Sequence, residues 1–205
     1  MTRDMKRGKL IAIYGINGIG KTTQVGRLVE YLRSRGVRVA RLKYPIYDLE
    51  PEGPFIHMYL RDLDFRTANP QTTEELQEKY AENRRRYEPT LREWLNSGEW
   101  IVAEDYIGTG IAWGLTWGAD LEYMEKINED LLSADLSVLM HGDRFDTAIE
   151  KDHRNEMAAE RIVISKNFHD LLADRYGWTR IDANRSVEEV GEEIRDVVST
   201  EFDLS

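Results

Sequence analysis

The stretch Gly15-Ile-Asn-Gly-Ile-Gly-Lys-Thr22 follows the short apolar run 9–14 and precedes a segment of helical periodicity, 22–35. It matches the pattern G-x-x-x-x-G-K-S/T, in which a strand passes through a glycine-rich turn into a helix. Glycines let consecutive backbone N–H groups point at one anion, and the N-terminus of the following helix adds a favourable dipole. The stretch therefore predicts a phosphate-binding loop. Lys21 would reach the β- and γ-phosphates of a nucleotide, and Thr22 would place its hydroxyl on Mg²⁺.

Apolar runs alternate with segments of helical periodicity along the rest of the chain. We expect strands at 9–14, 37–42, 100–103, 136–140 and 178–181, and helices at 22–35, 72–95, 106–117, 121–132, 155–176 and from 186 onward. Two prolines and a glycine predict a loop over 48–54, with a short helix near 56–60. Capping-box patterns mark two of the helix starts, at Thr72 with Glu75 and at Ser186 with Glu189.

This alternation predicts an α/β fold: a doubly wound, mostly parallel five-stranded sheet flanked by helices. We expect one domain over residues 1–205, with a short lid at about 143–156.

The composition excludes several classes of protein. The chain has 205 residues, no cysteine and a formal net charge of −10, so disulfide scaffolds, thiolate zinc sites and cysteine nucleophiles are ruled out. The sequence contains no apolar run of about 18 residues and no signal-peptide core. An acidic chain is also a poor non-specific binder of nucleic acid. We expect a cytoplasmic protein that binds neither membranes nor nucleic acid.

Further motifs follow the phosphate loop in order. They are Lys43-Tyr-Pro-Ile-Tyr-Asp48, Tyr80-Ala-Glu-Asn-Arg84, Trp100-Ile-Val-Ala-Glu-Asp-Tyr106, Asp152-His-Arg-Asn-Glu156 and Ile181-Asp-Ala-Asn-Arg-Ser186. In order and spacing they resemble the thymidylate kinase family nearly from end to end. The resemblance implies a P-loop fold, a homodimer, and transfer of the γ-phosphate of ATP to dTMP with Mg²⁺ as cofactor.

The resemblance also implies roles for single residues on the donor side. Those expected to take part in catalysis are Lys21, Glu104 and Arg154. Those expected to bind ATP are Gly15, Asn17, Gly18, Ile19, Gly20, Lys21, Thr22, Thr23, Lys151 and Asn184. Mg²⁺ would be held by Thr22 and Glu104, with Asp105 as a further candidate. Glu104 ends a predicted strand, at the edge where doubly wound sheets bind their ligands.

On the acceptor side, the residues expected to bind dTMP are Tyr44, Tyr47, Tyr80, Arg84, Tyr106 and Trp113. Tyr80 would stack on the pyrimidine, and Arg84 would lie near the base and the phosphate. Trp113 would lie against the deoxyribose, where it would crowd a 2′-hydroxyl.

The sequence departs from the family pattern at two places. Asp105 stands where the family has an arginine that would contact phosphate, which reverses the local charge. Asn17 replaces a carboxylate that bonds the sugar hydroxyl, and Gly18 is typical of members whose lid supplies positive charge. The lid candidates for that charge are Lys151, His153 and Arg154.

Two alternatives stay open. The first is a deoxynucleoside kinase acting on a 5′-hydroxyl, a class that also combines a phosphate loop with a glutamate at the strand end. The second is a catalytically weakened, nucleotide-gated binding module, which the charge reversal at Asp105 motivates. The base preference is also open at this stage.

Overall fold

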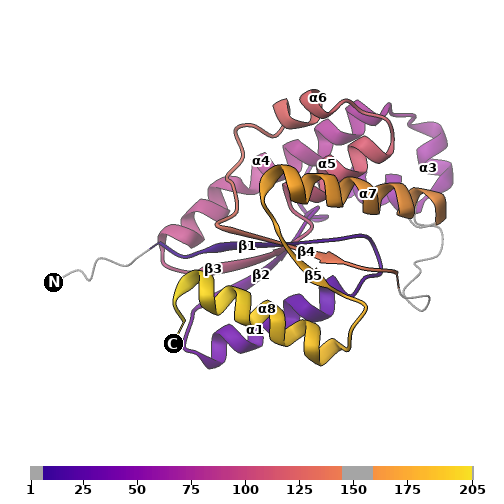
Figure 1. Ribbon diagram of the computed structural model, residues 1–205. Coiled ribbons are helices and arrows are strands. Elements are labelled where there is room, and N and C mark those ends of the chain that lie inside the picture. The colour runs from indigo at the N-terminus through magenta and orange to yellow at the C-terminus, as the bar shows by residue number, and fades with distance from the viewer. Residues whose placement is uncertain (1–6, 145–158, 205) are drawn as a thin grey trace.

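A parallel sheet forms the centre of the molecule. The structure is a computed structural model that describes residues 7–144 and 159–204 (Figure 1). Its strands are β1 Leu10–Tyr14, β2 Val39–Lys43, β3 Trp100–Glu104, β4 Leu136–His141 and β5 Thr179–Asp182. Within the described residues they form one five-stranded sheet in the order β2-β3-β1-β4-β5, and every pair is parallel. The predicted fold class is confirmed.

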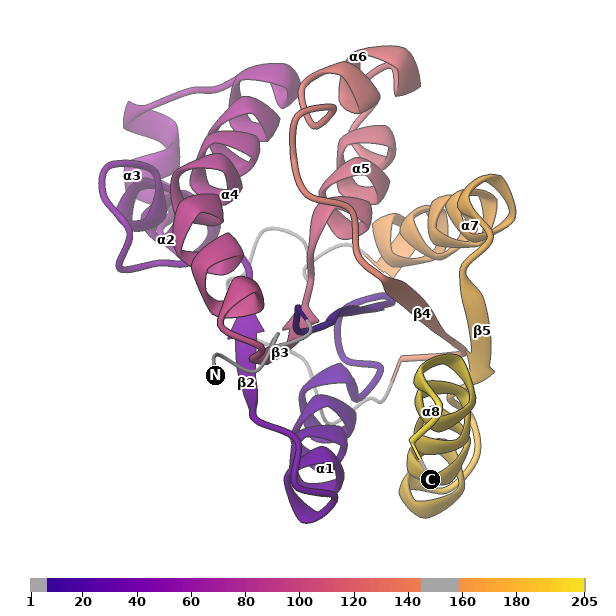
Figure 2. The ribbon, with the colours of Figure 1, turned by 90° about the vertical axis from the view of Figure 1, so that its left-hand side faces the viewer.

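Helices cover both faces of this sheet. Their bounds are α1 Lys21–Ser34, α2 Glu52–Arg61, α3 Leu63–Ala68, α4 Thr73–Asn96, α5 Ile107–Thr116, α6 Leu121–Lys126, α7 Ala159–Tyr176 and α8 Val187–Phe202. Helices α1 and α8 lie on one face, and α4, α5 and α7 lie on the other (Figures 1 and 2). Helix α2 packs on α4, and α6 packs on α5. Burial on both faces explains why the inner strands β1, β3 and β4 read as nearly continuous apolar runs.

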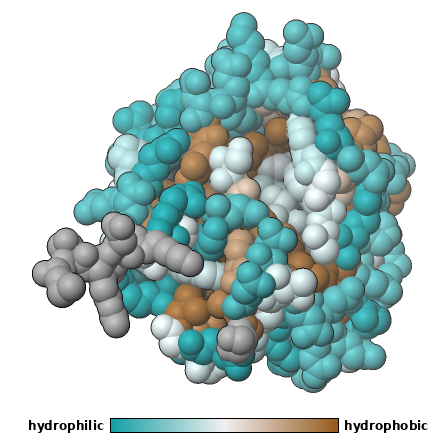
Figure 3. Space-filling view, turned by 60° about the vertical axis from the view of Figure 1, so that its left-hand side comes forward, coloured by the Kyte–Doolittle hydropathy of each residue, from teal (hydrophilic) through white to brown (hydrophobic). Residues whose placement is uncertain are grey.

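The surface reflects the high charge content of the chain. Hydrophilic residues cover most of the face seen in Figure 3, and hydrophobic residues show between them in separate patches. Among the described residues, no helix is both long and apolar enough to cross a membrane.

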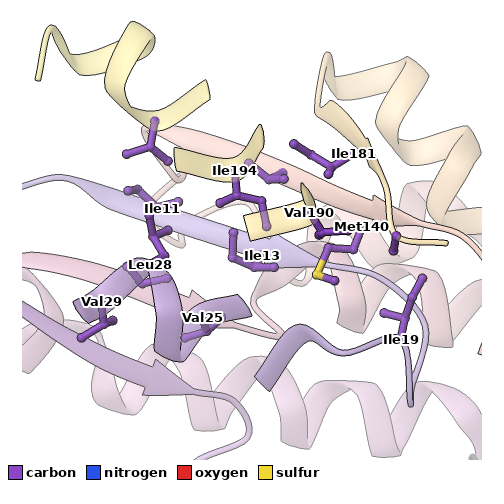
Figure 4. Packing of buried hydrophobic residues seen from close by; sticks show 14 of the residues in the cluster. Ile11, Ile13, Ile19, Val25, Leu28, Val29, Met140, Ile181, Val190 and Ile194 are labelled. Carbon is purple, nitrogen blue, oxygen red and sulfur yellow. The ribbon is translucent and has the colours of Figure 1, made fainter. Parts of the chain in front are cut away.

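Strand β1 is buried over its whole length and anchors the phosphate loop that follows it. Ile11 and Ile13 pack with α1 and α8, as Figure 4 shows. Leu10 and Ala12 belong to the core on the opposite face, together with Leu91 of α4. This alternation is the two-residue period of a strand, and it fixes the point at which the loop leaves the sheet.

The predicted loop over 48–54 is wrong in its second half, because α2 begins at Glu52 and contains Gly53 and Pro54. A proline is tolerated in the first turn of a helix, where its missing N–H would have no partner anyway. Gly53 has a packing reason: a Cβ there would lie 2.3 Å from the carbonyl oxygen of Ile46. Helix α3 was also not predicted.

The helix predicted over 121–132 ends early, at Lys126. The Asn128 side chain donates to the carbonyl oxygen of Met124 at 2.8 Å and takes the place of the next helical donor. Both capping boxes are confirmed, and α4 continues through Pro89. The predicted start of the helix over 155–176 lies outside the described residues.

Candidate active site

The phosphate loop has the backbone that its glycines predict. Gly15, Gly18 and Gly20 have φ values of 142°, 77° and 92°, in the region that favours glycine. A Cβ on Gly15 would lie 2.7 Å from the carbonyl oxygen of Met140. Gly20 is the N-cap of α1, whose N-terminus has neither a side-chain cap among the described residues nor an acid in its first turn. This helix end suits a bound anion.

Lys21 lies beneath this loop and is only 5% exposed. Its Nζ donates to the carbonyl oxygens of Gly15 and Ile16 at 2.8 and 3.0 Å. It also pairs with Asp105 Oδ1 at 3.3 Å. An ammonium has three N–H groups, so these contacts match its full donor capacity.

Glu104 lies at the carboxyl end of β3 and is 1% exposed. Its carboxylate accepts from Lys43 Nζ at 2.8 Å, Arg41 Nη2 at 2.6 Å and Thr22 Oγ1 at 2.6 Å. Burial raises the pKa of Glu104, but the bonds from Lys43 and Thr22 and the nearby positive charges outweigh it and hold that pKa below its usual range. The carboxylate is therefore ionised at neutral pH.

The contact between Thr22 and Glu104 brings a hydroxyl and a carboxylate oxygen together, and both are ligands that suit Mg²⁺. No cluster of three or more acids or histidines occurs in the part of the chain that the structure describes. Mg²⁺ usually takes one or two protein ligands together with substrate phosphates, and Thr22 and Glu104 could supply such a pair.

Asp105 follows Glu104 in a left-handed backbone conformation, with φ 61°. Besides its pair with Lys21, it accepts a hydrogen bond from Thr109 Oγ1 at 3.2 Å. Burial raises the pKa of Asp105, against the opposing effect of Lys21.

A cavity of about 650 Å³ extends from the phosphate loop to residues of α2, α4 and α5. Its charged lining residues are four cations and two acids: Lys21, Lys43, Arg61, Arg84, Glu104 and Asp105. The cavity is therefore locally cationic within a protein of net charge −10. Such a cavity can attract an anion despite the charge of the whole molecule.

Arg84 of α4 forms part of the cavity wall and is 3% exposed. Its Nη2 donates to Asn128 Oδ1 at 2.9 Å, and a Cβ on Gly110 would lie 2.9 Å from the same nitrogen. Burial lowers the pKa of Arg84, although a guanidinium stays charged in proteins. Within the described residues, the buried Nε of Arg84 has no hydrogen-bond partner. A buried charge of this kind favours an anionic or polar ligand.

Aromatic side chains form much of the remaining wall: Tyr44, Tyr47, Tyr80, Trp113 and Trp117. Arg61 Nη1 donates to the Tyr47 hydroxyl at 3.1 Å, and its guanidinium lies over that ring at 5.0 Å. Asn83 fixes the segment that carries Tyr44 and Tyr47, because its amide both accepts from Ile46 N and donates to Ile46 O. The aromatic wall thus has a defined position opposite the phosphate loop.

The cavity brings together most of the residues expected from sequence: Asn17, Gly18, Gly20, Lys21, Thr22, Thr23, Tyr44, Tyr47, Tyr80, Arg84, Glu104, Asp105 and Trp113. Gly15 and Ile19 shape the loop from behind: Gly15 packs against Met140, and Ile19 is buried in the core. Asn184 follows β5 and accepts a hydrogen bond from Asp143 N. Lys151, His153 and Arg154 lie outside the described residues.

Tyr106 is not among the residues that line the cavity. Tyr106 is 1% exposed and belongs to the core between β3 and α4. Its hydroxyl donates to the carbonyl oxygen of Leu132 at 2.8 Å. The left-handed turn at Asp105 directs the chain so that the next side chain enters the core, which the motif does not reveal.

Sequence reasoning missed several residues that shape the cavity. Lys43 is the last residue of β2, one position beyond the predicted strand, and it pairs in register with Glu104. Arg61 ends α2, and its contact with Tyr47 depends on tertiary structure. Asn83, through its two hydrogen bonds with Ile46, and Gly110, through its close approach to Arg84, act by contacts that depend on tertiary structure.

Comparison with known proteins agrees with this geometry. The family model for thymidylate kinase matches residues 13–194. The chain is 25% identical to thymidylate kinase from Dictyostelium discoideum, covering 97% of this chain and 88% of that protein. It is 28% identical to the human thymidylate kinase, covering 93% and 89%. A solved structure of thymidylate kinase from Candida albicans superimposes with a TM-score of 0.80 at 20% identity, over 97% of this chain and 94% of that one, and so shares the fold. The chain belongs to the thymidylate kinase family.

Proposed function

We propose that this protein transfers the γ-phosphoryl group of ATP to dTMP and releases ADP and dTDP. The observation that carries the proposal is the single cavity that joins the phosphate loop to the buried Arg84 and its aromatic surroundings. Membership of the thymidylate kinase family supports the same reaction.

On the donor side, the loop from Gly15 to Thr22 and the N-terminus of α1 would bind the ATP phosphates. Lys21 would contact the β- and γ-phosphates, and Thr22 and Glu104 would hold Mg²⁺. When bound, Mg²⁺ would neutralise phosphate charge and fix the geometry of the transferred group. Lys151 and Arg154 remain proposed contacts to the same phosphates.

On the acceptor side, Tyr80 and Trp113 would pack against the base and the deoxyribose. Arg84 would hold the base and the phosphate, and Lys43 and Arg61 would add positive charge near the transferred group. Phosphoryl transfer needs mainly in-line positioning and charge stabilisation, and these residues supply both.

Glu104 is poorly suited to act as a general base, since the strong hydrogen bonds it accepts lower its pKa. A kinase that activates a nucleoside 5′-hydroxyl would need such a base. This observation favours a monophosphate acceptor, whose phosphate oxygen is already ionised.

A substrate panel tests the proposal. Purified protein with ATP and Mg²⁺ is assayed for ADP release with dTMP, dUMP, dCMP, dAMP, AMP and thymidine. We expect the highest kcat/KM with dTMP and no turnover of thymidine. Turnover of thymidine but not of dTMP, or of none of the monophosphates, would overturn the proposal. The Lys21→Met variant controls for contaminating kinases.

From family membership we also propose a cytoplasmic homodimer. Sedimentation velocity on the purified chain checks the assembly, and a monomer mass at micromolar concentration would contradict it.

A further inference from the structure

We propose that Asp105 is a positioning residue that holds the Lys21 ammonium against the phosphate loop and competes for it with the phosphates of ATP. The inference rests on the ATP site of the proposed function and deepens it. It gives a role to the one acid that stands where the family resemblance implies an arginine.

Lys21 uses its full donor capacity on neighbouring groups of the protein. Its three N–H groups are matched by Gly15 O, Ile16 O and Asp105 Oδ1. To bind a phosphate oxygen, Lys21 has to release one of these contacts. The contact with Asp105 is the longest, at 3.3 Å against 2.8 and 3.0 Å for the carbonyl oxygens. The two carbonyl oxygens belong to the loop itself, so Asp105 is the partner that a phosphate replaces most directly.

The two neighbouring acids, Glu104 and Asp105, make different direct contacts. The carboxylate of Glu104 is engaged by Lys43, Arg41 and Thr22. Asp105 takes Lys21 and is held in place by Thr109 and by its left-handed backbone. Glu104 thus has direct contacts with Arg41 and Lys43, whereas among the described residues Asp105 is the acid that pairs with the lysine of the loop.

The expected consequence is a gain in ATP affinity when the charge of Asp105 is removed. In Asp105→Asn the amide oxygen can still accept a hydrogen bond from Lys21, but a phosphate then meets no competing charge. We expect metal-free ATP to bind about five- to tenfold more tightly, an effect on the scale of one charge a few ångströms away in a partly screened site.

The experiment is titration calorimetry of metal-free ATP against the full chain. Asparagine adopts the left-handed conformation readily, so Asp105→Asn preserves the local backbone. Asp203→Asn is the matched control, because Asp203 also has a left-handed backbone, φ 52°, but is exposed at the C-cap of α8. Lys21→Ala, alone and combined with Asp105→Asn, tests whether the effect passes through Lys21.

The proposal predicts tighter binding for Asp105→Asn, no change for Asp203→Asn, and loss of the gain in the Lys21→Ala background. Unchanged or weaker binding of metal-free ATP by Asp105→Asn would overturn it. A gain that persists without Lys21 would also overturn it, because the effect would then be direct charge repulsion between Asp105 and the phosphates of ATP.

A parallel titration with Mg²⁺ present tests whether Asp105 acts as a ligand of the metal instead. If Asp105→Asn leaves the affinity for metal-free ATP unchanged and weakens binding when Mg²⁺ is present, Asp105 is a metal ligand and the positioning role is wrong. If the unmodified chain binds no ATP at all, the proposed function fails together with this inference. If it binds ATP but Asp105→Asn brings no gain, only this inference fails.

Discussion

Arg84 is a buried positive charge that the fold surrounds with tyrosines. Burial disfavours the charged form of its guanidinium, and Tyr106, Tyr44, Tyr14 and Tyr80 lie near it. Asn128 supplies one hydrogen bond, and Gly110 supplies the space for the guanidinium. Burying a charge is unfavourable unless its hydrogen bonds are completed, and a bound ligand would complete those of Arg84.

Gly110→Ala tests the placement of Arg84 without altering any charge. The added methyl would lie 2.9 Å from Nη2 and 3.1 Å from Nη1, so the guanidinium has to move. We expect kcat/KM for dTMP to fall by roughly tenfold, since small displacements of positioning groups are costly, while KM for ATP stays unchanged.

Gly26→Ala in α1 is the control for Gly110→Ala, because nothing lies within 4 Å of its added Cβ. It should leave kinetics unchanged and raise stability by up to about 1 kcal/mol. If kcat/KM for dTMP is unchanged in Gly110→Ala, the proposed role of Arg84 in binding dTMP is contradicted.

Local pattern predicted the donor half of the site at the level of single residues and only part of the acceptor half. Gly20, Lys21 and Thr22 follow from one contiguous motif, whose geometry depends on its own backbone. The pair between Lys21 and Asp105 depends instead on φ 61° at the end of β3, which no spacing rule reveals. Asn128 also could not be predicted, because its partner Arg84 is 44 residues away.

At the scale of elements, α4 positions both Tyr80 and Arg84, so its start is important for the acceptor site. The capping box at Thr72 is complete: Glu75 N donates to Thr72 Oγ1, and Thr72 N donates to the Glu75 carboxylate. Only apolar periodicity and the cap were needed to predict this helix.

Thr72→Ala should lower the free energy of unfolding by about 1 kcal/mol, because it removes the acceptor for one N–H at the start of the helix. Urea unfolding measures the change, and Thr72→Ser, which keeps the hydroxyl, should recover most of the loss. An alanine variant as stable as the unmodified chain would show that this cap is not needed for α4.

The prediction of elements is wrong where residues with a high propensity for loops fit the first turn of a helix. Pro51, Gly53 and Pro54 signalled a loop, yet two of them fit the first turn of α2. Arg61, at the far end of that helix, lines the cavity through tertiary contacts that the local pattern does not reveal. Strands were easier to predict, because a sheet covered on both faces requires apolar runs that are visible in the sequence.

At the scale of the molecule, the distribution of charge is more informative than its sum. The final stretch 186–205 contains seven acids and one base, and most of it forms α8 on the face shared with α1. The cavity, in contrast, contains more cations than acids. The net charge of −10 is therefore compatible with binding two phosphorylated substrates.

Stability should depend on pH through His169, which is 1% exposed in α7. Burial lowers the pKa of His169 from 6.5 to about 4, and its Nδ1 donates to the carbonyl oxygen of Ser165. The His169 imidazole binds a proton more readily in the unfolded chain than in the folded one. The contribution of neutral His169 to the free energy of unfolding is therefore complete above the pKa of the unfolded chain, and it is lost as the pH falls through the pKa of the folded protein. Lowering the pH from about 7 to about 5 should reduce the free energy of unfolding by about 2 kcal/mol through His169.

Urea unfolding at these two pH values, for the unmodified chain and for His169→Gln, isolates the contribution of His169. The difference in stability between the two pH values should be smaller in the variant, whatever its absolute stability. An equal pH dependence in both proteins would show that His169 is not buried in its neutral form.

Reaction of ATP and dTMP in one cavity is tested most sharply by quantifying both products in one reaction mixture. With ATP, Mg²⁺ and dTMP, chromatographic quantification should give dTDP and ADP in equal amounts, and neither should form with Lys21→Met. ADP formed without dTDP would contradict the account, because it would mean that the phosphate loop hydrolyses ATP without transfer to the acceptor.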